Sequence, residues 1–162
     1  MKKIVFILIL SFLFIKCGIV HADNFVVSIH FTEGEKSKDS WSSETSISII
    51  GNTLSYSKTY SGSIKNGKKT VDKTCTLTNL QVAEIQKLIK DGSLLISDSI
   101  EDKDSKYKSF EHFVNISADF IMEEKVSKIR INGDVQSIED KELYKNCNKL
   151  INLVEEYVDK CE

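Results

Sequence analysis

The chain has 162 residues, a formal net charge of −2 and no proline, so its turns must be formed by Gly, Asn, Asp or Ser. This length suffices for a single domain with its own hydrophobic core. Basic residues are scattered and do not outnumber acidic ones. There is thus no electrostatic reason to expect binding to nucleic acid or to an anionic membrane surface.

The first 22 residues have the three-part layout of a secretory signal peptide. Residues 1–3 form a basic start, residues 4–15 form an apolar run broken by Ser11, and Val20 and Ala22 place small residues before a possible cleavage site. The apolar run is shorter than the roughly 20 residues that cross a bilayer. We therefore expect cleavage and no integral membrane span in the mature chain.

Cleavage after Ala22 would separate a signal peptide, residues 1–22, from one exported domain, residues 23–162. The signal segment holds three lysines and no acidic residue, so the domain would carry 19 basic and 24 acidic residues, a net charge of −5. We expect this domain to be secreted or periplasmic.

Cys17 allows a different interpretation, in which the chain is cut before this cysteine and acylated there as a lipoprotein of the cell envelope. Such processing requires small residues ahead of the cysteine, whereas Ile15 and Lys16 are bulky and charged. Cleavage after Ala22 is therefore favoured, and a lipid anchor at Cys17 is the alternative.

Alternating apolar residues predict several strands in the first half of the domain. Gly51 and Asn52 form a two-residue hairpin signal between two of them. The polar stretch 32–45 is interpreted as a loop, and Cys75 should face the core. The expected strands cover residues 25–32, 47–50, 54–60 and 71–77.

A helix follows the fourth strand. Thr78 and Gln81 have the spacing of a capping box, in which each side chain bonds the other residue's backbone N–H. Gly92 can terminate the helix. Leu80 is expected on its apolar face together with three later residues, Ile85, Leu88 and Ile89.

The last third of the sequence predicts a hairpin followed by a C-terminal helix. Residues 94–96 are expected to be extended and 97–109 to form an exposed loop. The predicted hairpin strands are 114–122 and 126–131, with a break at 132–134. A helix beginning near Ser137 or Asp140 has an apolar stripe at helical spacing, made of Leu143, Cys147, Leu150, Ile151, Val154, Val158 and Cys161.

These elements predict an α+β fold. An antiparallel sheet built from hairpins would carry one inserted helix and a C-terminal amphipathic helix, packed on one face.

Three cysteines follow the signal segment. Cys147 and Cys161 lie 14 positions apart on one predicted helix, a separation of about 21 Å, so they cannot bond to each other. Cys75 is then the common partner. We favour Cys75–Cys147, because helix ends fray; Cys75–Cys161 and three free thiols are the alternatives.

Aromatic residues of the first half are candidates for a binding site. Trp41, the single tryptophan, lies in the polar stretch and could anchor a ligand or fold back over the sheet. Tyr56 and Tyr60 could extend its surface. No cofactor or metal site is expected, because the cysteines and histidines lack ligand spacing.

The expected function is that of a non-enzymatic exported domain that binds a protein or a small ligand outside the cytoplasm. The face of the sheet opposite the helices is the place where such binding is expected. The alternative is a small secreted hydrolase in which His30 and His112 act as acid and base.

Overall fold

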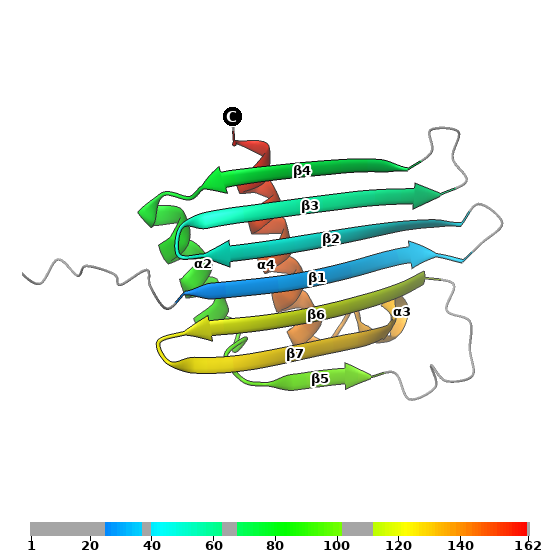
Figure 1. Ribbon diagram of the computed structural model, residues 1–162. Helices are drawn as coiled ribbons and strands as arrows, with labels where there is room; N and C mark the ends of the chain where they lie inside the picture. The colour runs from blue at the N-terminus through cyan, green and yellow to red at the C-terminus, as the bar shows by residue number, and fades with distance from the viewer. Residues whose placement is uncertain (1–24, 37–39, 63–67, 102–111, 162) are drawn as a thin grey trace, which may run out of the picture.

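The computed structural model describes residues 25–36, 40–62, 68–101 and 112–161. Seven strands form one sheet in the order β4-β3-β2-β1-β6-β7-β5 (Figure 1). The strands are β1 (Val26–Glu35), β2 (Trp41–Ile50), β3 (Thr53–Gly62), β4 (Lys69–Thr76), β5 (Asp98–Glu101), β6 (His112–Met122) and β7 (Lys125–Asp134). The helices are α2 (Asn79–Asp91), α3 (Val135–Ile138) and α4 (Glu142–Asp159).

The α+β class and the C-terminal helix are confirmed, but the sheet is mixed rather than antiparallel. Edge strand β5 pairs with β7 in parallel, whereas β1 to β4, β6 and β7 pair antiparallel. This strand lies within the stretch that the sequence indicated as an exposed loop. The short helix α3 is a further addition to the single inserted helix that was expected.

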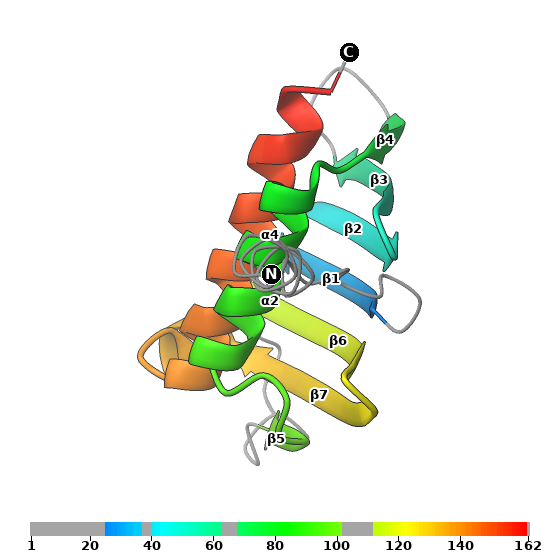
Figure 2. The same ribbon diagram turned by 90° about the vertical axis from the view of Figure 1, so that its left-hand side faces the viewer.

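Helices α2 and α4 cover one face of the sheet and leave the other face open, as Figure 2 shows. Buried aliphatic and aromatic residues from the strands meet the apolar stripe of α4 on the covered face. The two helices also contact each other, because the Tyr157 hydroxyl donates to Glu84 at 2.6 Å. Successive side chains along the strands therefore point alternately to the buried side and to the solvent, as expected when one face of an antiparallel array is covered.

The capping box of α2 is confirmed. The N–H of Gln81 donates to the Thr78 hydroxyl at 3.3 Å, and the N–H of Thr78 donates to the Gln81 side chain at 2.8 Å. Gly92 is the C-cap, and its N–H donates to the carbonyl of Leu88. Leu80 is not on the apolar face, because 84% of its surface is exposed.

Several strands are longer than the sequence predicted. The stretch 32–45 is not a loop throughout: β1 continues to Glu35 and β2 begins at Trp41, and these two residues are paired. Strand β7 continues through 132–134. Residues 94–96, expected to be extended, form a turn in which the Leu94 N–H donates to the Ile89 carbonyl.

The disulfide joins Cys75 to Cys161, with the Cα atoms 6.0 Å apart. The favoured pairing of Cys75 with Cys147 is wrong, and Cys147 is a free, buried cysteine. The fraying argument fails because Lys73 donates to the carbonyls of Val158 and Cys161 and so holds the end of α4 against β4.

Candidate functional site

Two rows of small polar side chains cross β1 to β4 on the open face. The strand register places Ser28, Ser48, Ser55 and Thr74 side by side in the first row. It places His30, Ser46, Ser57 and Asp72 side by side in the second. Six of these eight residues carry a hydroxyl, and neighbouring strands are about 4.8 Å apart, so the rows form a regular array of donors and acceptors.

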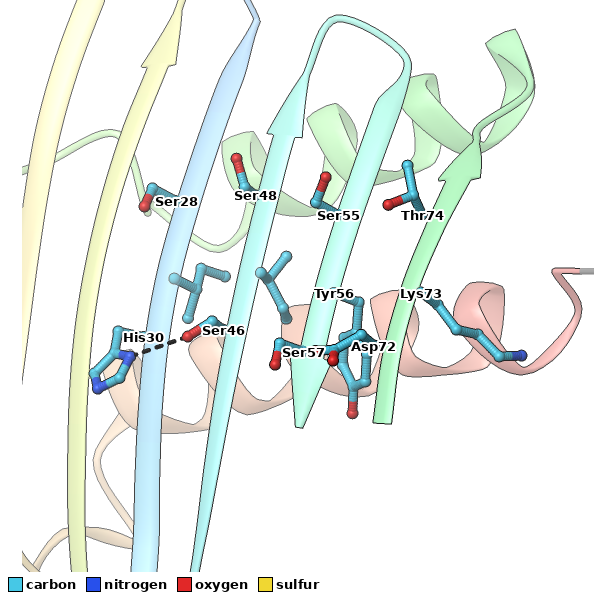
Figure 3. Close-up of a pocket in the computed structure, with 12 residues that line it drawn as sticks. Ser28, His30, Ser46, Ser48, Ser55, Tyr56, Ser57, Asp72, Lys73 and Thr74 are labelled. Carbon is cyan, nitrogen blue, oxygen red and sulfur yellow. Dashed lines mark hydrogen bonds between the residues drawn. The ribbon is translucent and has the colours of Figure 1, made fainter. Parts of the chain in front are cut away.

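This array lines a trough with a volume of about 590 Å³. Figure 3 shows both rows facing the viewer from four adjacent strands. Serine side chains are short, so they leave the strand backbones close to the surface and hollow the face. The trough is bordered on the β6 side by the exposed Asp119–Arg130 ion pair, whose atoms are 2.9 Å apart. The position and lining fit a shallow binding surface built on rigid strands.

A short chain of contacts runs through the second row. The Nδ1 atom of His30 is 3.2 Å from the Ser46 hydroxyl, and its Nε2 atom is 3.4 Å from the Glu44 carboxylate. Serine hydrolases use these residue types in this order. They also need N–H donors aimed at the developing oxyanion. The backbone groups around Ser46 belong instead to paired interior strands, so the arrangement favours binding over acyl transfer.

His30 and His112 do not share a site. His30 is on the open face, whereas His112 belongs to the opposite side of β6, where its Nε2 atom lies 3.3 Å from Glu35. The register pairs His30 with Ser117, and a strand rises about 3.4 Å per residue. The two imidazoles therefore lie far apart on different faces and cannot act as acid and base on one substrate.

The three aromatic candidates lie on the helix side of the sheet rather than on the open face. The Trp41 indole donates to Glu35 at 3.2 Å, next to the His112 contact. Tyr56 donates to Glu155 of α4 at 2.8 Å. Tyr60 is 42% exposed and lies beneath the Lys58 ammonium, 5.4 Å from its ring centre. The structure therefore places the three aromatics on the helix side of the sheet, and of the three only Tyr56 also contributes to the lining of the trough.

A polar cluster surrounds these aromatic residues. Lys58 donates to Glu155 at 2.9 Å. Burial alone would lower the pKa of Lys58, but the bond to Glu155, the charge of Glu155 and the neighbouring Tyr60 together raise the pKa overall. Burial, with the bond to Glu155, also raises the pKa of Tyr56. Burial raises the pKa of Glu33, although Lys58 partly offsets the effect.

Two buried hydroxyls belong to the same region. Ser43 and Thr45 are almost wholly buried, and their hydroxyl oxygens have no hydrogen-bond partner in the described part of the chain. In the register, Ser43 lies between Glu33 and Tyr60. The cluster is closely packed, and we interpret it as a structural contact between sheet and α4.

No family model matches this chain, and no curated protein sequence matches it. Within the described ranges, no group of three or more His, Cys, Asp or Glu side chains could hold a metal ion. The helices that can be described are too short or too polar to cross a bilayer.

Of the trough lining, only His30 and Tyr56 were candidates from the sequence. The serine rows were missed, although a signal for them is present. Serine recurs at every second position in two consecutive strands, as Ser46 with Ser48 and Ser55 with Ser57. This spacing puts the hydroxyls on one face of each strand. The pattern becomes a surface only when the register aligns the strands.

Proposed function

We propose that this chain is an exported, non-enzymatic binding domain that holds a neutral, hydroxyl-rich ligand, such as an oligosaccharide, in the open-face trough. The observation that carries the proposal is the double row of hydroxyls on β1 to β4. Each Ser or Thr hydroxyl can both donate and accept a hydrogen bond. An array of such groups complements a ligand that also presents alternating donors and acceptors.

The charge of the lining supports a neutral ligand. The lining contains a single carboxylate, from Asp72, a single imidazole, from His30, and a single ammonium, from Lys73, which donates to the carbonyls of Val158 and Cys161. A strongly charged ligand would instead require a surplus of one sign at the site. The exposed pair Asp119–Arg130 at the border is internally neutralised.

The scaffold supports a binding role because it is preorganised. Each trough residue belongs to a strand with a paired neighbour, so the site is largely formed before a ligand arrives. Export is supported by the signal-like first 22 residues and by the disulfide, which is typical of oxidising compartments outside the cytoplasm.

The proposal is tested by calorimetric titration of a panel of neutral oligosaccharides into the purified protein. Ser48→Arg would fill the trough with a long charged side chain. Asn115→Arg introduces the same side chain on β6, on the open face but outside the trough. We expect Ser48→Arg to weaken binding at least about tenfold and Asn115→Arg to change it less than about twofold. Equal losses in both variants, or no binding by the wild type, would reject the proposal.

A further inference from the structure

A second cavity lies between the two long helices, on the side of the molecule away from the trough. Helices α2 and α4 lie side by side over the covered face of the sheet (Figure 2). Their neighbouring sides border a cavity of about 390 Å³, which is within the size range of small-molecule sites. Four residues of α2 and three of α4 line it at helical spacing, together with Gly92. The cavity is therefore separate from the oligosaccharide site proposed above.

The two helices that border the cavity run antiparallel. Near the start of α2, Glu84 accepts a hydrogen bond from the hydroxyl of Tyr157, which lies near the end of α4. Just after the end of α2, the carbonyl of Gly92 accepts a hydrogen bond at 3.2 Å from the side-chain amide of Asn146, near the start of α4. These two bonds define one end of the cavity beside Glu84 and the other end beside Gly92.

The antiparallel arrangement sorts the charges of the lining by sign. Lys87 precedes Asp91 on α2, and Glu142 precedes Lys149 on α4. Because the helices run in opposite directions, Asp91 and Glu142 both belong to the Gly92 end, and we call them the carboxylate pole. Lys87 and Lys149 both lie nearer the other end, and we call them the ammonium pole. At 1.5 Å per residue, the poles are about 6 Å apart along α2 and about 10 Å apart along α4.

The charges of the two poles do not neutralise each other. All four side chains are exposed. Within the described part of the chain, none of them makes an ion pair or a side-chain hydrogen bond. The remaining charged residue of the lining, Glu84, is engaged by the Tyr157 hydroxyl. The cavity therefore presents two poles of opposite charge that remain available to a ligand.

A buried amide lies between the two poles. Asn146 is 9% exposed, and its side-chain N–H donates to the Gly92 carbonyl. Its side-chain oxygen accepts no hydrogen bond from any residue that the structure describes, although buried polar atoms normally have a partner. On α4, Asn146 is placed between Glu142 and Lys149 in the lining of the cavity. The unused acceptor can therefore bind an N–H group of a ligand that spans the two poles.

The geometry points to a short zwitterionic peptide as the ligand of this cavity, and we propose that the domain binds free peptides of two or three residues there. An extended chain spans about 3.5 Å per residue, so two or three residues cover the distance between the poles. The terminal ammonium of the peptide faces the carboxylate pole, its terminal carboxylate faces the ammonium pole, and a backbone N–H donates to Asn146. The partly buried Leu88 offers an apolar contact to a peptide side chain. A single amino acid carries both charges on one carbon and is too short.

The test is calorimetric titration of the purified protein with trialanine at low ionic strength, where charge pairing is least screened. Two blocked peptides are the matched controls: N-acetyl-trialanine lacks the ammonium group, and trialanine amide lacks the carboxylate. We expect saturable binding of trialanine and at least about tenfold weaker binding of each blocked peptide. The trough variant Ser48→Arg should bind trialanine as the wild type does, because the trough lies on the opposite face of the sheet.

Variants of the carboxylate pole locate the site. Asp91→Asn with Glu142→Gln should weaken trialanine binding at least about tenfold. The control, Glu124→Gln with Glu156→Gln, also removes two exposed carboxylates, but neither residue lines the cavity. It should change the affinity for trialanine by less than about twofold.

Several results would overturn the proposal. One is the absence of saturation up to about 10 mM trialanine, and another is binding of the blocked peptides as tight as that of the free peptide. Equal losses in the two double variants would place the peptide elsewhere, and loss of binding in Ser48→Arg would place it in the trough. Tighter binding of spermidine than of trialanine would assign the cavity to organic cations instead.

Discussion

Cys75 on β4 and Cys161 after α4 form a disulfide that joins the edge strand of the sheet to the end of the last helix. The bond spans 86 positions of sequence. Lys73, two residues before Cys75, reinforces the same corner by donating to the carbonyls of Val158 and Cys161. The final turn of α4 is therefore fixed to the sheet by one covalent bond and two hydrogen bonds.

Removing this disulfide should cost much of the stability of the domain. A closed loop of this length corresponds to about 4–5 kcal/mol of unfolded-state entropy. We predict that Cys75→Ser lowers the free energy of unfolding by about 3–5 kcal/mol, measured by urea denaturation. Adding a reductant should not lower the free energy of unfolding of this variant any further. Cys147→Ala is the control: it should remain sensitive to reductant. A peptide map linking Cys75 to Cys147 would contradict the structure.

Cys147 should be unreactive in the folded protein. It is 2% exposed, and burial raises the pKa of its thiol from 9.0 to about 12. Only the thiolate attacks alkylating reagents, so we predict that iodoacetamide labels Cys147 at pH 8 no faster than the protein unfolds. Rapid labelling under native conditions would show that the thiol is accessible.

The same thiol contributes to the pH dependence of stability. Its folded pKa is raised above the unfolded value, so the folded state keeps its proton longer. The stability that the protonated thiol contributes is fully present below its ordinary pKa of 9.0 and is lost as the pH rises toward 12. Urea denaturation between pH 8 and 10 should show a smaller decline in Cys147→Ala than in the wild type; identical declines would argue against a buried thiol.

Glu33 should destabilise the domain when it ionises. Burial raises the pKa of its carboxyl. The domain therefore has its full stability below the ordinary pKa of Glu33, where the carboxyl is protonated in both states. It loses part of that stability as the pH rises through the raised pKa of the folded state. We predict that Glu33→Gln increases the free energy of unfolding at pH 7 and that the gain disappears near pH 4. A gain that is the same at both pH values would show that ionisation of Glu33 is not its cause.

Glu155 connects α4 to β3 through two bonds, since Tyr56 and Lys58 both donate to its carboxylate. Glu155→Leu would leave the partly buried ammonium of Lys58 and the hydroxyl of Tyr56 without this acceptor. We predict a loss of about 2–3 kcal/mol in the free energy of unfolding. The neighbouring Glu156 is exposed, so Glu156→Leu should change the free energy of unfolding by less than about 0.5 kcal/mol. Similar losses in both variants would count against the bonded contact.

Sequence patterns identified the elements wherever burial and periodicity coincide. Phe25 to Phe31 alternate because their inner side faces the helices, and Thr78 and Gln81 define the start of α2 by local bonding alone. The extensions of β1 and β2 were missed because Glu33 and Ser43 occupy inward positions usually held by apolar residues. The strands continue there through backbone hydrogen bonds, which do not require apolar residues and so cannot be recognised from the composition.

The candidate site depended on information that the sequence does not contain. Trp41 was expected in a loop, but it belongs to a strand and faces away from the trough. The trough arises because the register aligns Ser28, Ser48 and Ser55, and alignment between strands is set by long-range pairing. Leu80 likewise fits a helical apolar stripe but is exposed, because the sheet and α4 do not reach it.

Binding in the open-face trough is tested most directly by amide chemical-shift mapping of the isotope-labelled protein during titration with neutral oligosaccharides. We predict saturable shifts confined to the two rows on β1 to β4, centred on Ser46, Ser48, Ser55 and Ser57, and absent in Ser48→Arg. No saturable shift with any of these ligands, or shifts centred on Trp41 and Tyr60 on the opposite face, would contradict the proposed site.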